Sequence, residues 1–279
     1  MRVAVTGGSG LLGRRIVTRL ARDHEVVNID IRAPRDGSEP YVECSVLDID
    51  GIQRAIHGYD AVVHAAGLPG PRFGTPEELM NINAEGSLQV GRACAAGGIR
   101  RLVFISSESV LGFVFSGGEV RPRYFPIDEG HPLLPSEPYG KSKLLAETYL
   151  EQETAPRLPL LILRPPWIWV PQEYEQYRNL LTTPEQWSGG LWAYIHGDDV
   201  AEAVACGLAA DLPVGCHAAF MAAPDNGTVY PTRELVGRFF PKIGIPDDVT
   251  EFGSLISSDM LETLTGFRPT RSWREFLTT

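Results

Sequence analysis

A tyrosine and a lysine four residues apart form the pair with the clearest chemical use in the sequence. Tyr139 and Lys143, in PYGKSKLLAE, would lie on one face of a helix with about 5–6 Å between their Cβ atoms. An ammonium about 4 Å from a phenolate, at an effective dielectric constant of about 20, would lower the phenol pKa by about two to three units. The spacing therefore indicates a phenol that can act as a base near neutral pH. An exposed tyrosine beside a solvated lysine is the alternative, and it is the commoner arrangement when such a pair stands alone.

A cluster of small polar residues follows an apolar run and offers a partner for this phenol. The segment SSESV comes directly after RLVFI, so it would lie at the carboxyl end of a strand, where ligands bind in a doubly wound sheet. A serine hydroxyl there can bond the substrate oxygen that exchanges a proton with Tyr139. For Ser106 and Ser109, capping of the strand end or of a turn explains the residue type equally well.

The glycine-rich stretch TGGSGLLG, residues 6–13, predicts a nucleotide site. It joins an apolar run to a segment of helical period, and such a turn presents free backbone N–H groups to a pyrophosphate. It has two possible registers, one using Gly7 and the other Gly8, each continuing through Gly10 and Gly13. Because no Lys-Ser or Lys-Thr follows, the phosphate loop of nucleoside triphosphatases is excluded.

An acid about 20 residues beyond the glycines specifies the dinucleotide. Asp30 ends the apolar run EVVNID, where a carboxylate accepts hydrogen bonds from the ribose hydroxyls of NAD and repels the 2′-phosphate of NADP. Arg32 lies two positions further on and would partly offset that repulsion. The sequence therefore favours NAD and leaves NADP open.

The elements that must position these residues alternate between short apolar strands and helices. Strands are expected at 2–6, 25–30, 41–46, 60–67, 101–107, 158–164 and 216–223, and helices at 11–23, 76–98, 139–153, 197–212, 232–239 and 257–264. This alternation predicts a parallel, doubly wound α/β sheet. Residues 112–138 hold five prolines and no sustained period, which indicates an irregular functional loop. The segment after Arg164, rich in Pro, Trp and Tyr, suits a ligand-facing lobe better than a sheet.

Composition narrows the class of protein. The 279 residues carry a net charge of −10, which disfavours nucleic acid as a partner. No apolar run reaches the roughly 20 residues of a membrane span, and no signal peptide is recognisable, so we expect a cytoplasmic protein without a membrane partner. The four cysteines form no C-x-x-C pair, and neither they nor the histidines show metal-ligand spacing, so no metal is expected.

Taken together, these motifs resemble the extended short-chain dehydrogenases/reductases, the group with nucleotide-sugar epimerases and dehydratases. TGGSGLLG is similar to the family's G-x-x-G-x-x-G, HAAG to its fourth-strand signature and RPPWIW to its R-P-x-x-x-Y segment. The resemblance makes Gly7, Gly10 and Gly13 the functional triplet and Gly8 an accidental match. It implies a Rossmann sheet with a small C-terminal substrate lobe, and a homodimer formed through the helices at 76–98 and 139–153.

The resemblance also assigns roles to individual residues. The catalytic residues that it implies are Ser107, Tyr139 and Lys143. The cofactor-binding residues expected for NAD are Gly7, Gly10, Leu11, Leu12, Gly13, Asp30, Arg32, Asp48 on the adenine side, Ala65, Ala66, Gly67, Asn83, Tyr139 and Lys143. The NAD-binding domain is expected to comprise 1–165 and 194–222, and the substrate lobe 166–193 and 223–279.

Departures from the family pattern restrict the expected activity. Leu111 stands where epimerases usually carry a tyrosine, and Glu108 and Ser109 stand where dehydratases carry Asp and Glu. A dehydratase set is therefore absent, and for Glu108 a surface or supporting role is favoured over acid-base catalysis. Arg178 can bind an anion, although a surface role is favoured. The tryptophans at 167, 169, 187 and 192 would either stack on a sugar ring or fill the core of the lobe.

The resulting hypothesis is an NAD-dependent oxidoreductase or epimerase that acts on a secondary hydroxyl of a sugar, sugar acid or nucleotide sugar. The small lobe resembles that of the uronate dehydrogenases, so an alternative is a sugar dehydrogenase that releases NADH. A non-catalytic NAD-binding regulator is less favoured, because it would have no chemical reason to keep Ser107, Tyr139 and Lys143.

Overall fold

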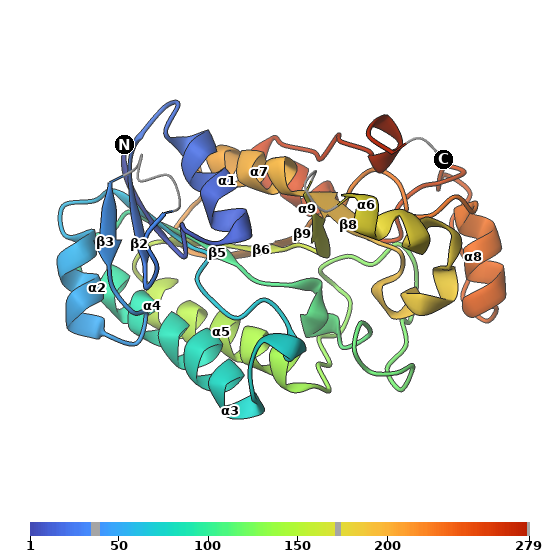
Figure 1. The fold of residues 1–279 in the computed structure, drawn as a ribbon, viewed down its shortest axis with the longest axis horizontal. Helices are drawn as coiled ribbons and strands as arrows, with labels where there is room; N and C mark the ends of the chain where they lie inside the picture. The colour runs from blue at the N-terminus through green and yellow to red at the C-terminus, as the bar shows by residue number, and fades with distance from the viewer. Residues whose placement is uncertain (35–39, 171–173, 278–279) are drawn as a thin grey trace.

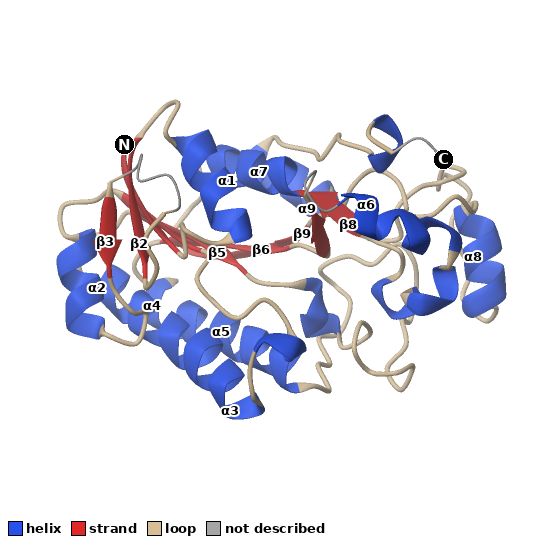
Figure 2. Cartoon of the chain, in the orientation of Figure 1, coloured by secondary structure: helices blue, strands red, loops and turns tan. Residues whose placement is uncertain are grey.

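A parallel β-sheet forms the centre of the molecule (Figures 1 and 2). The computed structural model describes residues 1–34, 40–170 and 174–277. The strand order across the sheet is β3-β2-β1-β4-β5-β6-β9. The strands are β1 (Arg2–Thr6), β2 (Glu25–Asp30), β3 (Tyr41–Glu43), β4 (Ala61–His64), β5 (Arg101–Ile105), β6 (Pro159–Arg164) and β9 (Gly215–Phe220). The order reverses between β1 and β4, and at such a point a doubly wound sheet binds its ligand.

Helices cover both faces of the sheet, which explains why its strands are nearly continuous apolar runs. In Figure 1, α1 (Leu11–Leu20) and α7 (Gly197–Ala209) lie on one face, while α2 (Ile49–Ile56), α4 (Gly86–Ala96) and α5 (Pro138–Thr154) lie on the other. The remaining helices are α3 (Pro76–Leu79), α6 (Tyr174–Tyr177), α8 (Thr232–Phe239) and α9 (Asp259–Thr265). Two separate buried clusters fill the space between the sheet and these layers. The predicted α/β doubly wound fold is confirmed.

Short turns complete the chain. The 3-10 turns are η1 (Pro71–Phe73), η3 (Glu108–Leu111), η5 (Arg178–Thr182), η6 (Pro184–Gln186), η7 (Ser188–Gly190) and η8 (Trp273–Glu275), and η2 (Met80–Glu85) is π-helical. The helix expected at 76–98 is thus α3, η2 and α4 in succession. Within the described residues, no helix has both the length and the apolar character needed to cross a membrane.

Helix α2 is an element that the sequence analysis missed. Its signal is present, because Ile52 and Ile56 are buried on one face and Asp48 caps the helix by accepting a hydrogen bond from the Gly51 N–H at 2.9 Å. The neighbouring strand was expected at 41–46, yet β3 ends at Glu43. The end of that run gives way to the turn that leads into the cap of α2.

The lobe beyond β6 has its own core. Contrary to the expectation of no sheet, β7 (Trp167–Trp169) and β8 (Tyr194–His196) pair in parallel. Trp169, Trp187 and Trp192 are buried there, which decides their role as core residues, whereas Trp167 is 42% exposed. Residues from 110–127 pack into the same cluster. The predicted division into two domains stays a prediction, and 171–173 and 278–279 of its lobe lie outside the described residues.

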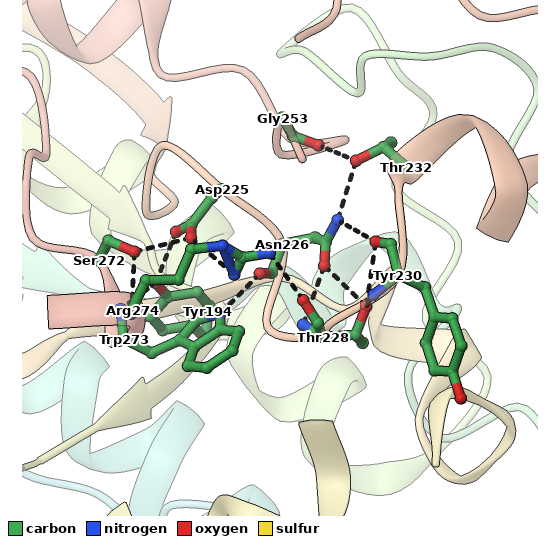
Figure 3. Close-up of polar contacts among 10 residues, drawn as sticks. All are labelled: Tyr194, Asp225, Asn226, Thr228, Tyr230, Thr232, Gly253, Ser272, Trp273 and Arg274. Atoms are coloured by element: carbon green, nitrogen blue, oxygen red, sulfur yellow. Dashed lines mark hydrogen bonds and ion pairs between the residues drawn. The ribbon is translucent and has the colours of Figure 1, made fainter. Parts of the chain in front are cut away.

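A polar network ties the end of the described chain to this lobe (Figure 3). The Asp225 carboxylate accepts hydrogen bonds from the Tyr194 hydroxyl at 2.6 Å and from the Ser272 hydroxyl at 2.7 Å. The Tyr194 oxygen in turn accepts the Trp273 backbone N–H at 2.7 Å. Arg274 pairs with Asp225 at 3.2 Å. Because Tyr194 and Trp273 are buried, each of these polar groups depends on its partner.

Removal of one hydroxyl from this network should destabilise the whole chain. We expect Tyr194→Phe to lower the free energy of unfolding by about 1–3 kcal/mol, because it leaves the Trp273 N–H without its acceptor and removes one of the donors to Asp225. Urea denaturation followed by tryptophan fluorescence measures this change. The matched control is Tyr149→Phe, whose hydroxyl meets Glu85 only at 3.5 Å. Equal losses in the two variants would contradict the role of the network.

Candidate active site

The three predicted catalytic residues come together at the carboxyl end of β5. Ser107 lies two residues beyond this strand, and Tyr139 and Lys143 lie in the first turns of α5. The Ser107 hydroxyl lies near the Tyr139 phenol and acts to lower its pKa. Tyr139 and Lys143 are both buried, at 7% and 6% exposure. An exposed pair on a surface helix, the alternative to a catalytic pair, is therefore wrong.

The start of α5 is held firmly against the serine turn. Glu137 caps the helix, and its carboxylate accepts the backbone N–H groups of Tyr139, at 2.6 Å, and of Gly140. A Cβ at Gly140 would lie 2.5 Å from the Ser109 carbonyl oxygen, so only glycine permits this approach. The Phe115 ring meets the Tyr139 ring edge-on, with 6.3 Å between centroids. The phenol thus has little freedom to move away from Ser107.

The electrostatics of the pair differ from the expectation. Burial raises the pKa of Tyr139 to about 12, against the opposing effect of the Ser107 hydrogen bond. Burial also lowers the pKa of Lys143 to about 8, and its ammonium donates to the Ile105 carbonyl at 2.9 Å. Lys143 therefore does not lower the phenol pKa in this structure, and that part of the prediction is wrong. Desolvation dominates the pKa of the phenol, because the Lys143 ammonium is directed at the Ile105 carbonyl and not at Tyr139.

A buried ion pair behind the lysine was missed by sequence reasoning. Glu147, one turn beyond Lys143, accepts hydrogen bonds from Arg164 Nε at 3.0 Å and Nη2 at 2.7 Å. The Ser106 hydroxyl donates to the same carboxylate at 2.5 Å. Glu147 thereby joins α5 to the ends of β5 and β6. Its only sequence signal is its place on the helix face that carries Tyr139 and Lys143.

The glycine turn has the shape of a phosphate cradle. Gly7 has φ +75°, and its Cβ would lie 2.6 Å from Ala66. A Cβ at Gly13 would lie 2.0 Å from the Gly7 oxygen, whereas at Gly10 the closest atom would be 3.1 Å away. Gly10 is also the N-cap of α1, and no side chain bonds to the first turn of this helix. The turn therefore offers backbone donors beside an open position, which fits a pyrophosphate.

Gly8 has a packing role that the sequence analysis did not anticipate. A Cβ there would lie 2.3 Å from the Asn28 side-chain oxygen, so Gly8 is required by its contact with β2. The register that uses Gly8 is therefore accidental for phosphate binding, but the glycine itself is needed for packing. Leu11 and Leu12 follow in the first turn of α1, where Leu11 is 44% exposed.

The acid predicted to bind ribose is buried at the end of β2. Asp30 accepts hydrogen bonds from the Ser9 N–H at 3.1 Å and from the Arg32 N–H at 3.0 Å. These bonds hold the carboxylate against the glycine turn, as NAD requires. The Arg32 side chain is exposed. Asp48 lies beyond β3, where its carboxylate caps α2.

Residues after β4 connect this cradle to the catalytic helix. Ala65, Ala66 and Gly67 follow the strand directly. The Asn83 amide donates to the Leu68 carbonyl at 3.2 Å and to the Ser142 hydroxyl at 3.1 Å, and it accepts the Leu68 N–H at 2.8 Å. Asn83 thus fixes the loop after Gly67 against α5. It lies in the π-helical segment η2, and such segments are frequent at functional sites.

Comparison with known proteins identifies the chain. A family model described as "NAD dependent epimerase/dehydratase family" matches residues 3–182. The chain belongs to this family. As a member of it, the protein is an NAD-dependent enzyme, and the predicted membership of the extended short-chain dehydrogenases/reductases is confirmed.

Two relatives of this protein are matched over different fractions of their own length. L-arabinose 1-dehydrogenase (NAD(P)(+)) of Haloferax volcanii is 31% identical over 68% of this chain and 76% of its own length. UDP-glucose 4-epimerase of Bos taurus is 32% identical over 52% of this chain and 47% of its own length. The chain thus spans less than half of the epimerase.

Solved structures share the fold over almost the whole chain. A short-chain dehydrogenase/reductase superfamily protein from Agrobacterium tumefaciens with bound NAD has a TM-score of 0.74 at 20% identity, covering 99% of this chain and 95% of that one. Uronate dehydrogenase from Agrobacterium tumefaciens has a TM-score of 0.71 at 20% identity, covering 99% and 86%. At this identity the likeness describes the fold alone.

The residues of this family member fit NAD. The glycine cradle, the fixed Asp30 and the loop held by Asn83 lie along the carboxyl ends of β1, β2 and β4. In residues 1–34, 40–170 and 174–277, no group of three His, Cys, Asp or Glu is arranged to hold a metal ion.

A buried histidine under this loop should make the fold sensitive to acid. His64 bonds the Thr6 hydroxyl through Nδ1 at 2.7 Å and the Ser87 hydroxyl through Nε2 at 2.9 Å. Complete burial and the Lys143 charge lower the pKa of His64 to about 3. The unfolded chain binds the proton at about pH 6.5. His64 therefore contributes stability above that pH, and this stability is lost as the pH falls toward 3.

The expected effect is a loss of about 1.4 kcal/mol of unfolding free energy per pH unit below about pH 6. Urea denaturation between pH 7 and 5 should show this slope in the wild type and a shallower slope in His64→Gln, although that variant is less stable at pH 7. His57 is exposed, and His57→Gln should follow the wild type. Parallel slopes for wild type and His64→Gln would refute the assignment.

Proposed function

We propose that this enzyme is an NAD-linked dehydrogenase that oxidises a secondary hydroxyl of a sugar, with Tyr139 as base, Ser107 as the group that orients the hydroxyl, and Lys143 as the supporting cation. The observation that carries the proposal is the placement of a buried phenol, Tyr139, near the Ser107 hydroxyl at the ligand-binding edge of the sheet, where Ser107 acts on the phenol pKa. A substrate oxygen bound at this edge can reach both groups.

The chain's own residues perform the proton transfer. Ser107 donates to the substrate oxygen and fixes its orientation, and Tyr139 accepts the hydroxyl proton in its phenolate form, which exists only after the phenol has released its own proton to solvent. Bound NAD supplies the hydride acceptor and, when oxidised, a positive charge. With its pKa at about 12, Tyr139 is protonated in the free protein at neutral pH. Cationic charge near the phenol, including that of Lys143 once its bond to Ile105 is relaxed, therefore governs its activity.

Two observations favour release of NADH over epimerisation. The chain matches most of the arabinose dehydrogenase and less than half of the epimerase. Leu111, at the position of the usual epimerase tyrosine, is 1% exposed and packs in the lobe core. A nucleotide-sugar epimerase that returns the hydride to the sugar is the second candidate, and the epimerase relative supports it. Asp30 supports NAD over NADP.

Replacement of the base tests the catalytic assignment. We expect Tyr139→Phe to lower kcat by at least about a thousandfold, because it removes the proposed proton acceptor beside Ser107, while NAD binding is retained. Formation of NADH at 340 nm with sugars, uronic acids and nucleotide sugars measures turnover, and isothermal titration calorimetry measures NAD binding. Phe115→Tyr serves as a control on the neighbouring ring. Undiminished turnover in Tyr139→Phe would overturn the assignment.

The 340 nm signal also separates the two candidates. A dehydrogenase accumulates NADH in proportion to substrate consumed, whereas an epimerase changes the sugar with no net signal. Formation of an epimeric sugar without NADH would overturn the dehydrogenase and support the epimerase.

We also propose a homodimer built from α4 and α5, which lie side by side on one outer face (Figure 1). Light scattering should give twice the chain mass of 30.6 kDa. Leu145 on α5 is half-buried, and Leu145→Glu should give the monomer mass, whereas Val214→Glu, at a residue 58% exposed elsewhere, should not. A monomeric wild type would defeat this proposal. The cytoplasmic location stays a prediction of the sequence.

A further inference from the structure

Glu108 is a buried acid beside the reacting groups, and the proposed proton transfer does not use it. It follows Ser107 directly, is 5% exposed, and its backbone N–H donates to the Pro165 carbonyl at 2.9 Å. This bond fixes the residue where the ends of β5 and β6 meet. The favoured surface role for Glu108 is therefore wrong, because the chain folds the side chain inward between Tyr139 and the lobe.

The carboxyl group of Glu108 is unpartnered. It makes no hydrogen bond and no ion pair with any residue that the structure describes. The unpaired polar atoms that are fully enclosed include the Ser109 hydroxyl but neither carboxyl oxygen of Glu108, so each of these oxygens keeps a small accessible area. A buried acid with unsatisfied oxygens that still touch open space is placed to bond a ligand.

The lobe residue that lies near this carboxyl group is a glycine, which has no side chain. A Cβ at Gly190 would lie 3.9 Å from Glu108 Oε1, so the turn η7 passes the acid at ordinary contact distance. Glu108 also acts on Tyr139, because its charge raises the pKa of the phenol. The acid therefore lies between the catalytic tyrosine and the lobe expected to hold the substrate.

The basic groups in this region have other partners. Lys143 donates to Ile105, Arg164 is bound by both oxygens of Glu147, and Arg178 pairs with Glu175 at 3.0 Å. Burial alone raises the pKa of Glu108 well above its usual range, with no cation acting against it. Burial thus favours the protonated form of the side chain, a carboxylic acid with one O–H donor and one free acceptor.

We propose that Glu108 binds two hydroxyl groups of the substrate and so selects a sugar that carries no charge near the reacting carbon, in preference to a sugar acid. This inference rests on the proposed function. A carboxylic acid matches a vicinal diol, because it donates to one oxygen and accepts from the other. A substrate carboxylate at the same place would lose its hydration beside a buried acid, which is unfavourable. The sugar-acid substrate that the small lobe suggests is therefore disfavoured.

Binding measurements on a catalytically silent protein test the inference directly. In Tyr139→Phe saturated with NAD, isothermal titration calorimetry compares D-galactose with D-galacturonate and D-glucose with D-glucuronate, pairs that differ only in a hydroxymethyl or carboxylate group. We expect the neutral member of at least one pair to bind at least about tenfold more tightly than its acid, a difference of about 1.4 kcal/mol. Equal or tighter binding of the uronate, or no binding of either neutral sugar, would overturn the inference.

Substitutions of Glu108 in the same background identify the residue responsible. Glu108→Ala should weaken binding of the neutral sugar by about tenfold, because two hydrogen bonds are lost, without improving that of the uronate. Glu108→Gln keeps one donor and one acceptor and should retain the preference, with at most about a threefold loss. Glu151 is exposed on α5, and Glu151→Gln is the matched control. Unchanged sugar affinity in folded, NAD-binding Glu108→Ala would overturn the inference, and Glu108→Gln decides it if the alanine variant does not fold.

The same sugars separate failure of the inference from failure of the proposed function. With Tyr139 intact, NADH formed from uronates and not from neutral sugars would uphold the dehydrogenase and overturn the role of Glu108. A neutral sugar that binds in a Glu108-dependent way but yields neither NADH nor an epimer would refute the proposed function and leave the binding role supported.

Discussion

The position of helix α5 on the strand ends depends on one buried ion pair. Arg164 and Glu147 are 7% and 4% exposed, so neither can regain water without moving a strand or the helix. Removal of one partner would leave an uncompensated charge in the interior, a cost of about 3–5 kcal/mol. Because the pair fixes both the height and the rotation of α5, it also sets where Tyr139 and Lys143 meet Ser107. The placement of Tyr139 beside Ser107 thus depends on a pair that lies two turns further along α5.

Whether the sequence predicts a feature of this site depends on how far apart in the sequence the interacting residues are. Tyr139 and Lys143 are four residues apart on one helix, and the glycine turn is contiguous, so local spacing reveals both. The contact of Glu147 with Arg164 joins residues 17 positions apart in different elements, and no local period records it. Helix α2 was within reach of the same reasoning, because Asp48 and the isoleucines behind it form an ordinary cap and apolar face.

Charge states are harder to predict than positions, because they depend on burial. The spacing of Tyr139 and Lys143 indicates that a cation lowers the phenol pKa, yet the folded chain buries both groups and directs the ammonium to a carbonyl. The same effect raises the pKa of Glu108, which is buried rather than on the surface. In each case the residue type and its neighbours along the chain are as expected, and the loss of hydration, which only the three-dimensional packing determines, reverses the electrostatic conclusion.

The hydrogen bonds that join Tyr194, Asp225 and Trp273 affect the order in which the chain can fold during translation. β8 emerges from the ribosome well before Trp273, and until that tryptophan is made, the Tyr194 hydroxyl and the core around Trp169 lack their last cover. The sheet as far as β6 can begin to pack during translation, because α1, α2, α4 and α5 are already synthesised, although α7 follows later. The lobe cannot close until Trp273 is made. A nascent chain would therefore form the half with the glycine turn first and complete the lobe only after Trp273 has been synthesised.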